Sequence, residues 1–370
     1  MERKVVIFDY LVEGKESGHL ILDDEYWLNY FSRFEYDFTL YTSSYSRDFQ
    51  IKRNPNLGNR VKVLMGISIF SSLGSRFHAI GKIIKSPRFY KSKVIIQGFD
   101  EVSILVFFLL NAMRKNQFIL ILTNNISSGR LSKSPSILKA LLKIIFYASD
   151  IIIFHSEKEK ELIEEKFGSR FNEKLRKKKY HLIGRNCKLS AQSKKSNIIS
   201  FFGPVKKDKP LEPLIDLIRS DSERRFQYNI FNIDKESATL MSEFKYFDHV
   251  KISSGFMDDH AYEEAVMRSR YIFLSHNTEF EPKLSGNLCD CFANGIPFIS
   301  NSIYPAKEFV DAYGPLGFFF DIDRDETWPL KFLTSDSDKI HNDYVGNIGR
   351  LQEDYSYSRL VENTRVVLEE

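Results

Sequence analysis

The stretch EPKLSGNLCDCFANGIPFIS, residues 281–300, gathers side chains that could bind a negatively charged ligand. It contains two acidic residues, Glu281 and Asp290, and between them Ser285, Gly286 and Asn287. Carboxylates can hold hydroxyl groups, and serine or asparagine can begin a helix whose free N–H groups and dipole bind phosphate. Glycine lets the backbone approach a ligand closely. The stretch therefore predicts half of a ligand pocket, and a strand, loop and helix with surface acids is the alternative.

The same stretch contains a Cys-x-Cys pair, Cys289 and Cys291, which raises the question of a metal site. Two cysteines at this spacing project to different sides of a helix, and no Cys/His pair with zinc spacing accompanies them. With Cys187 the chain has three cysteines, which cannot form a disulfide framework and indicate a reducing compartment. We expect core or half-buried thiols and no metal.

Composition narrows the class of protein. The 370 residues are 43% hydrophobic and 14% aromatic, which excludes a disordered chain and favours two domains. A net charge of +4 is too small to indicate bulk nucleic-acid binding. The apolar run at 102–113 is shorter than the ~20 residues of a membrane span, and the N-terminus lacks the features of a signal peptide. Dinucleotide-binding and Walker glycine motifs are absent, which argues against a dehydrogenase or a kinase.

Short apolar strands alternate with helical stretches along the chain. In the first half the expected strands are 4–11, 37–43, 93–98, 117–125, 150–156 and 179–184, and the helices 23–34, 134–149 and 156–168. In the second half the expected strands are 197–203, 227–233, 249–255, 271–276 and 296–300, and the helices 209–220, 258–269 and 285–294. This pattern predicts an α/β protein with two doubly wound, Rossmann-like domains, whose ligands bind at the carboxyl ends of the strands. We expect domains at 1–185 and 197–350, a linker at 186–196 and a C-terminal helix at 351–370.

The C-terminal elements resemble those of GT-B glycosyltransferases, above all the retaining family 4. Members of that family carry a strand, an acid, a loop, a second acid on a helix, and Ala-x-Gly-x-Pro before a buried strand; here Asp290 is followed by CFANGIP. The resemblance implies that Glu281 contacts the transferred sugar and Asp290 the ribose. The family usually has two glutamates separated by seven residues, whereas here the second acid is aspartate and eight residues intervene. Glu279 is the alternative to Glu281.

A second resemblance lies in SFFGPVKKDKPLEPLI, residues 200–215. Family members show Gly-Arg after a strand and a lysine before a helix; Gly203 and Lys209 match, and Pro204 replaces the arginine. The resemblance implies that Lys209 stabilises the departing diphosphate electrostatically. Without the arginine, Lys206 or Lys207 can contribute to this stabilisation.

The N-terminal half offers weaker signals. Gly18 and His19 follow the first strand where these folds place a loop facing donor and acceptor, although a plain turn is equally compatible. Asn124 and Asn125 stand where relatives often have a histidine beside the reacting carbon, and we place Asn125 with Lys209 and Glu281 as catalytic residues. Retaining transfer tolerates the loss of this histidine if the leaving phosphate takes the acceptor's proton.

The resemblance implies a GT-B glycosyltransferase whose two domains face each other across a cleft, with the nucleotide sugar on the C-terminal domain and the acceptor on the N-terminal one. We expect sugar transfer to a glycan or polyprenyl-diphosphate-linked glycan in bacterial surface-polysaccharide (O-antigen, capsule or lipopolysaccharide) synthesis, retaining and metal-independent, with no cofactor. Basic patches at 74–93 and 174–188 suit the inner-membrane surface. We therefore expect a cytoplasmic protein that can attach peripherally, and no nucleic-acid partner.

Other readings of the sequence stay open. SGNLCDCFANGIP also resembles the donor helix of inverting fucosyltransferases, though their Glu-Lys pair is absent here. A GT-B epimerase or phosphorylase-like enzyme would use the same pocket. A non-catalytic glycosyltransferase-like partner protein would explain the missing arginine and histidine.

Overall fold

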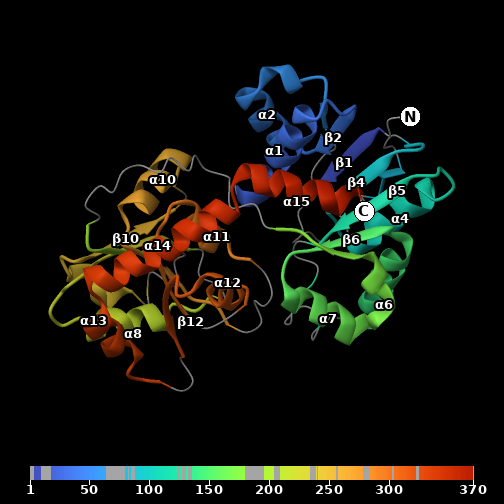
Figure 1. Ribbon diagram of the computed structural model, residues 1–370. Coiled ribbons are helices and arrows are strands. Elements are labelled where there is room, and N and C mark those ends of the chain that lie inside the picture. Colours follow the sequence, from blue (N-terminus) through green and yellow to red (C-terminus); the bar gives the residue numbers. More distant parts are fainter. Residues whose placement is uncertain are drawn as a thin grey trace. The chain divides into compact units, whose positions relative to one another are not determined.

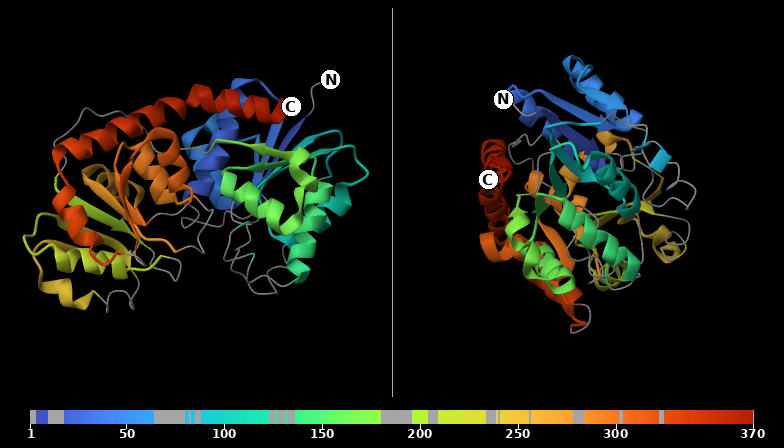
Figure 2. Two further views of the ribbon diagram at one scale, coloured as in Figure 1. Left: turned by 60° about the horizontal axis from the view of Figure 1, so that its bottom comes forward. Right: turned by 90° about the vertical axis from the view of Figure 1, so that its right-hand side faces the viewer.

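The chain divides into two compact units, residues 1–181 with 360–370, and residues 182–359. The computed structural model describes residues 4–9, 18–63, 80–81, 83–84, 88–122, 126, 131, 136–179, 196–203, 209–233, 239, 241–255, 257–277, 284–301, 304–321 and 325–369. Each unit contains a parallel sheet with helices on both of its faces (Figures 1 and 2). The structure is therefore α/β, as the alternation of strands and helices predicts.

The N-terminal unit is built on a seven-stranded sheet in the order β3-β2-β1-β4-β5-β6-β7. Its strands are β1 (Val5–Asp9), β2 (Phe38–Thr42), β3 (Val61–Val63), β4 (Lys93–Gly98), β5 (Gln117–Ile121), β6 (Ile151–Phe154) and β7 (Leu175–Lys177). All neighbours pair in parallel. The order reverses between β1 and β4, which is where doubly wound sheets bind ligands.

Helices cover both faces of this sheet. They are α1 (Gly18–Arg33), α2 (Ser44–Arg53), α4 (Glu101–Asn111), α6 (Ser136–Ala148), α7 (Glu157–Phe167) and α15 (Tyr357–Glu369), with short 3-10 helices at Pro55–Leu57 and Ser169–Lys174. Because crossovers between parallel strands are right-handed, α1 and α2 cover one face while α4, α6 and α7 cover the other. The helix α15 packs on α1: the Tyr26 hydroxyl lies 2.7 Å from Thr364 Oγ1 and donates to the Leu360 carbonyl at 3.2 Å.

The C-terminal unit is built on a six-stranded parallel sheet in the order β10-β9-β8-β11-β12-β13. Its strands are β8 (Ile198–Phe202), β9 (Gln227–Ile233), β10 (Val250–Ser254), β11 (Tyr271–Leu274), β12 (Phe298–Asn301) and β13 (Gly317–Phe320). Its helices are α8 (Glu212–Ser220), α10 (Asp259–Arg268), α11 (Gly286–Ala293), α12 (Ala306–Tyr313), α13 (Trp328–Ser335) and α14 (Asp338–Asp354), with a 3-10 helix at Ser242–Tyr246. The strand order reverses between β8 and β11.

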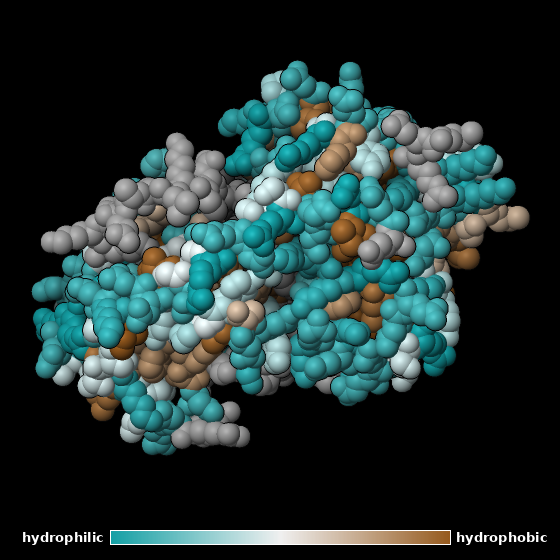
Figure 3. All heavy atoms as spheres, in the orientation of Figure 1, coloured by the Kyte–Doolittle hydropathy of each residue, from teal (hydrophilic) through white to brown (hydrophobic). Residues whose placement is uncertain are grey.

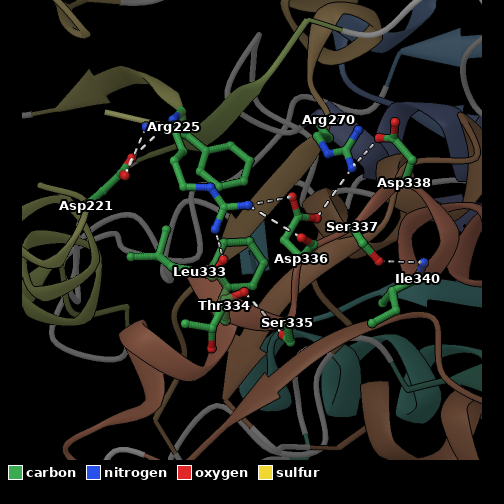
Figure 4. Close-up of polar contacts among 12 residues, drawn as sticks. Asp221, Arg225, Arg270, Leu333, Thr334, Ser335, Asp336, Ser337, Asp338 and Ile340 are labelled. Atoms are coloured by element: carbon green, nitrogen blue, oxygen red, sulfur yellow. Dashed lines mark hydrogen bonds and ion pairs between the residues drawn. The ribbon is translucent and has the colours of Figure 1, made fainter. Parts of the chain in front are cut away.

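A partly buried polar network lies at the amino edge of this second sheet (Figure 4). Asp336 accepts a hydrogen bond of 2.6 Å from the Tyr271 hydroxyl and lies 3.4 Å from Arg270 Nη2. Arg225 donates to the Leu333 carbonyl and lies 3.9 Å from Asp336. Since Tyr271 begins β11, these charges tie the start of a central strand to the turn between α13 and α14.

Three element boundaries differ from the sequence-based prediction. The helix expected at 23–34 is α1, and it begins earlier, at Gly18. The apolar residues HLIL, which precede the two aspartates at 23–24, belong to the same helix. The edge strand β7 lies at Leu175–Lys177, before the strand expected at 179–184; of that range only Lys179 is among the described residues. The helix expected at 351–370 is instead the end of α14 followed by α15. Of the linker expected at 186–196, only Ser196 lies among the described residues.

No helix in the described part of the chain is long and apolar enough to cross a membrane. The apolar run at 102–113 forms α4 and the turn after it.

Candidate functional site

The candidate site lies at the carboxyl edge of the C-terminal sheet, where the order of strands reverses between β8 and β11. Gly203 follows β8 directly, and its N–H donates to the Phe231 carbonyl at 2.9 Å. Ser275 and His276 follow β11, and both are buried. A doubly wound sheet opens a crevice at such a reversal, so residues after these two strands are placed to meet a ligand.

The start of α11 lies beside this crevice. Asn287 Nδ2 donates to the Phe202 carbonyl at 2.9 Å, which fixes the first turn of α11 against the end of β8. Ser285 precedes the helix with extended backbone (φ −76°, ψ 130°), but its side chain caps no backbone N–H. The Ser285 side chain is buried, and its hydroxyl has no hydrogen-bond partner among the described residues. An anionic ligand could accept hydrogen bonds from the free N–H groups at this helix start and from the buried Ser285 hydroxyl.

Asp290 lies one turn further along α11 and is positioned by a tyrosine of α10. The Tyr262 hydroxyl donates to Asp290 Oδ2 at 2.6 Å and lies 3.4 Å from Asn287 Oδ1. The ring of Tyr262 packs on Phe202, whose ring stacks on that of Phe231 at 5.3 Å. The carboxylate is therefore half-buried in a fixed orientation rather than solvated on a helix surface.

The predicted cation Lys209 lies close to His276. Burial, together with the positive charge of Lys209, lowers the pKa of His276 to about 3, so the imidazole is neutral at physiological pH. The side chain of Asn301, at the end of β12, accepts from the His276 N–H at 3.1 Å and donates to the His276 carbonyl. These bonds tie the His276 backbone to the end of β12, beside the crevice.

Gly203, Lys209, Ser285, Gly286, Asn287 and Asp290 are thus described at one edge of one sheet, or on the helix beside it. The remaining predicted residues of the donor pocket and of the asparagine pair lie outside the described residues: Lys206, Glu279, Glu281, Asn124 and Asn125. Sequence reasoning missed Tyr262 and the position of His276 beside the crevice. The signal for His276 was available, because it is the second residue after a fully apolar strand of a doubly wound sheet.

Gly18 and His19 are not in a loop, as the sequence-based prediction had them. They form the first turn of α1, and residues 11–17 lie outside the described residues.

The cysteines of the Cys-x-Cys pair are both free thiols, with Cys291 buried and Cys289 half-buried. No group of three His, Cys, Asp or Glu side chains that could hold a metal occurs within the described ranges. Asp336 and Asp338 form an Asp-x-Asp sequence, but both pair with Arg270 at the opposite edge of the sheet.

The N-terminal unit has its own polar cluster, at the reversal between β1 and β4. Asp24 Oδ2 accepts hydrogen bonds from Thr42 Oγ1 at 2.9 Å and from Ser46 Oγ at 2.7 Å. Asp9, the last residue of β1, accepts from Gln97 Nε2 at 3.1 Å. Burial and the nearby charge of Asp9 raise the pKa of Asp24 well above its usual range. No sequence motif indicated this cluster of buried acids.

Comparisons with known proteins identify the architecture. No protein-family model and no curated protein sequence matches the chain. Among solved structures, Anabaena Alr3699/HepE in complex with UDP and glucose is similar at a TM-score of 0.71 and 13% identity, covering 99% of each chain. A mutant of S. aureus TarM, in complex with ligands that include UDP, is similar at 0.68 and 10% identity, covering 100% of each.

The lipopolysaccharide outer core galactosyltransferase WaaB is similar at a TM-score of 0.62 and 13% identity, covering 99% of each chain. At such identities the likeness establishes the fold alone. Two doubly wound parallel sheets, matched over nearly the whole length of these structures, show that the chain has the GT-B fold.

Proposed function

We propose that this protein is a glycosyltransferase that transfers a sugar from a nucleotide sugar to a hydroxyl of a glycan or lipid-linked glycan. The observation that carries the proposal is the start of α11: it is uncapped, bonded to the end of β8 through Asn287, and lined by the buried Ser285 hydroxyl. Helix N–H groups and a hydroxyl donor suit a diphosphate, which has several acceptor oxygens.

Lys209 and His276 supply complementary chemistry for the departing diphosphate. Lys209 brings a positive charge, which stabilises the negative charge that develops on the leaving group. His276 stays neutral, with its pKa at about 3, so it can hydrogen-bond to the diphosphate without adding a second positive charge. We assign Asp290, which Tyr262 holds, to accept hydrogen bonds from ribose hydroxyls. Glu281 and Asn125 remain proposed catalytic residues by resemblance.

Similar proteins support the proposed donor and setting. HepE is solved with UDP and with UDP-glucose, and TarM with UDP, so uridine is the first base to test. WaaB is a lipopolysaccharide galactosyltransferase, which supports a role in surface-polysaccharide assembly. We further propose retention of the anomeric configuration without a metal, which NMR of the product anomer and assay with a chelator would test.

Thermal unfolding with UDP, GDP, CMP, dTDP and their sugars tests the proposal directly. A ligand that binds only the folded state adds about 2.7 kcal/mol at a hundred times its Kd. We expect one nucleotide to raise the Tm selectively, and Lys209→Ala to reduce that shift. Lys251→Ala, at an exposed lysine of β10, is the matched control and should respond like the natural protein. A folded protein with no shift for any donor, and no sugar transfer, would contradict the proposal.

A further inference from the structure

Two neighbouring helices of the N-terminal unit expose apolar side chains where a solvated helix would carry charges. On α4 and the turn after it, Leu109 is 77% exposed and Met113 is 96% exposed. On α6, Ile137 is 70% exposed and Ile144 is 52% exposed. The helices α4 and α6 lie side by side. Figure 3 shows hydrophobic atoms at the surface near the right-hand edge, where Figure 1 places α4.

The exposed residues follow the outward stripe of each helix. On α4 and the turn after it, the exposed Leu109 and Met113 are four residues apart, the spacing of one helical face, while Leu105, one turn earlier, is half-buried and packs on the core. On α6, Ile137, Ala140, Ile144 and Ala148 are spaced by three or four residues and are all exposed, while Leu142, Ile145 and Phe146 face the core. Both helices therefore expose apolar side chains to solvent as well as burying others in the core. Exposed apolar patches of this kind often mark a surface that binds a partner or a membrane. We call these two outward stripes the α4–α6 face.

The charged side chains within residues 102–116 and 136–148 are all basic; the nearest acids in the sequence are Glu101, which is buried, and Asp150, which accepts from the Phe118 N–H at 2.7 Å. Residues 102–116 and 136–148 contain no aspartate or glutamate, and their charged side chains are Arg114, Lys115, Lys139 and Lys143. The segment before β4 extends this surface, because Lys91 N–H donates to the Arg114 carbonyl at 3.0 Å. There Tyr90 is exposed, and the Lys91 ammonium lies 5.3 Å from its ring centre.

The third helix on the same side of the sheet provides an internal comparison. The helix α7 carries glutamates and lysines in alternation, and these form exposed pairs such as Lys158–Glu161 at 3.2 Å and Lys160–Glu164 at 3.9 Å. This is the surface of an ordinary solvated helix. The lack of acids on the outward stripes of α4 and α6 is therefore particular to these two helices and not general to the unit.

We propose that the α4–α6 face seats the N-terminal unit on the surface of a membrane rich in anionic lipids. Shallow insertion of apolar side chains, ringed by cations that bind lipid phosphates, is how amphipathic surfaces bind such membranes. Acidic residues, which anionic lipids would repel, are missing from both stripes. The last turns of α4 and α6 lie at the amino edge of the sheet, because crossover helices run antiparallel to their strands.

This surface differs from the basic patches that the sequence suggested. In the described part of 174–188, Lys174 donates to carbonyls at the end of α6, Lys177 lies 3.0 Å from Glu157, and Lys178 is buried. These three lysines therefore contact other parts of the protein or are buried, and they do not form a basic patch at the surface. The proposed surface shares only its Tyr90–Lys91 edge with the patch expected at 74–93.

Co-sedimentation of the full chain with vesicles tests the proposal. We expect binding to phosphatidylcholine vesicles that contain phosphatidylglycerol, and little binding to pure phosphatidylcholine. The double variant Leu109→Ser/Ile144→Ser should bind the anionic vesicles about tenfold more weakly or less. Lys139→Gln/Lys143→Gln should weaken binding to anionic vesicles and reduce its sensitivity to salt.

Leu330→Ser, at an exposed leucine of α13 in the other unit, is the matched control and should bind like the natural protein. Circular dichroism and unfolding temperature confirm that each variant is folded. The proposal is overturned if the natural protein does not bind anionic vesicles, or if the α4–α6 double variant binds as well as the control. Dimerisation in solution that the same double variant abolishes, without vesicle binding, would assign the face to a second copy instead. Vesicle binding is measured without nucleotide, so its outcome is independent of the proposed glycosyltransferase activity.

Discussion

At the scale of single residues, Tyr262 orients the acid that we place against the ribose. Its hydroxyl donates to Asp290 at 2.6 Å, and a hydrogen bond to a charged group contributes about 1.5–3 kcal/mol. We expect Tyr262→Phe to weaken binding of the nucleotide by up to about tenfold, because the carboxylate then samples other rotamers. Isothermal titration calorimetry measures this. Tyr246→Phe, at a tyrosine that is 86% exposed, is the control, and equal affinities for the two variants would argue against a role for Tyr262.

Lys178 should make the stability of the N-terminal unit depend on pH in the alkaline range. Burial lowers the pKa of its ammonium from 10.5 to about 7, and its Nζ lies 5.0 Å from the Tyr26 ring centre and 5.1 Å from that of Trp27. Between these two pKa values the unfolded chain binds the proton and the folded chain does not, so the free energy of unfolding rises with pH. That stability is lost as pH falls from about 10.5 to about 7.

We therefore expect Lys178→Met to flatten the rise in unfolding free energy between pH 7 and pH 10, measured by urea denaturation at each pH. Lys177→Met removes an exposed lysine next to it in the chain, and that variant should keep the slope. A variant at Lys178 with an unchanged slope would show that its pKa is not lowered.

The sequence predicted the local part of the site and missed the part that depends on the fold. Ser285, Gly286, Asn287 and Asp290 were found because they are consecutive or one turn apart at a helix start. Tyr262 could not be found, because its bond to Asp290 joins residues on two different helices. The influence of Lys209 on His276 likewise arises from folding, which brings the segments after β8 and β11 together.

At the scale of elements, Gly317 is required by the pairing of β13 with β12. It lies opposite Phe298, and a Cβ built at this position would lie 2.8 Å from the Phe298 nitrogen, 2.9 Å from its carbonyl carbon and closer still to its oxygen. Because backbone atoms cannot move aside cheaply, we expect Gly317→Ala to lower the free energy of unfolding by about 1–3 kcal/mol. Chemical denaturation checks this value.

Gly346 is the matched position, since it is exposed within α14 and a Cβ there meets no atom within 4 Å. Alanine is favoured over glycine in a helix, so Gly346→Ala should raise the unfolding free energy by about 0.5–1 kcal/mol. Similar effects of the two alanines would contradict the contact at Gly317.

Elements were predictable where burial dictated the residue types. The central strands are continuous apolar runs because both faces of a parallel sheet are covered. The helix α2 was missed because its sequence SYSRDFQIKR has little apolar periodicity; the side chain of Ser43 begins it by accepting from the Ser46 N–H at 3.1 Å. The strands β3 and β13 were missed because three or four residues at the sheet edge carry too short a pattern.

At the scale of the whole molecule, α15 completes the N-terminal unit although it follows the C-terminal unit in sequence. Besides its contacts with Tyr26, its Leu368 carbonyl accepts from Lys93 Nζ at 2.6 Å, and Asn363 Oδ1 accepts from the Lys179 N–H at 2.9 Å. The sequence does not indicate which domain the last helix joins, because the residue pattern of an amphipathic helix does not specify the surface on which it packs.

Truncation after Ser356 should therefore destabilise the N-terminal unit selectively. Removal of α15 exposes the aromatic residues of α1, so we expect the fluorescence of Trp27 to shift to the red and its unfolding to occur at lower temperature. A Trp328→Phe background isolates the signal of Trp27, since the chain contains two tryptophans. The reverse background, Trp27→Phe, reports on the C-terminal unit, whose transition should stay in place. Loss of both transitions together would show that α15 stabilises more than the N-terminal unit.

The placement of α15 also sets an order for folding during synthesis on the ribosome. Domains of most multidomain chains fold as they emerge, the N-terminal one first. Here residues 360–369, which cover α1, are translated after all of 182–359. The C-terminal unit can therefore reach its final packing while the N-terminal unit, made first, still lacks a helix and is open to chaperones at the aromatic surface around Trp27.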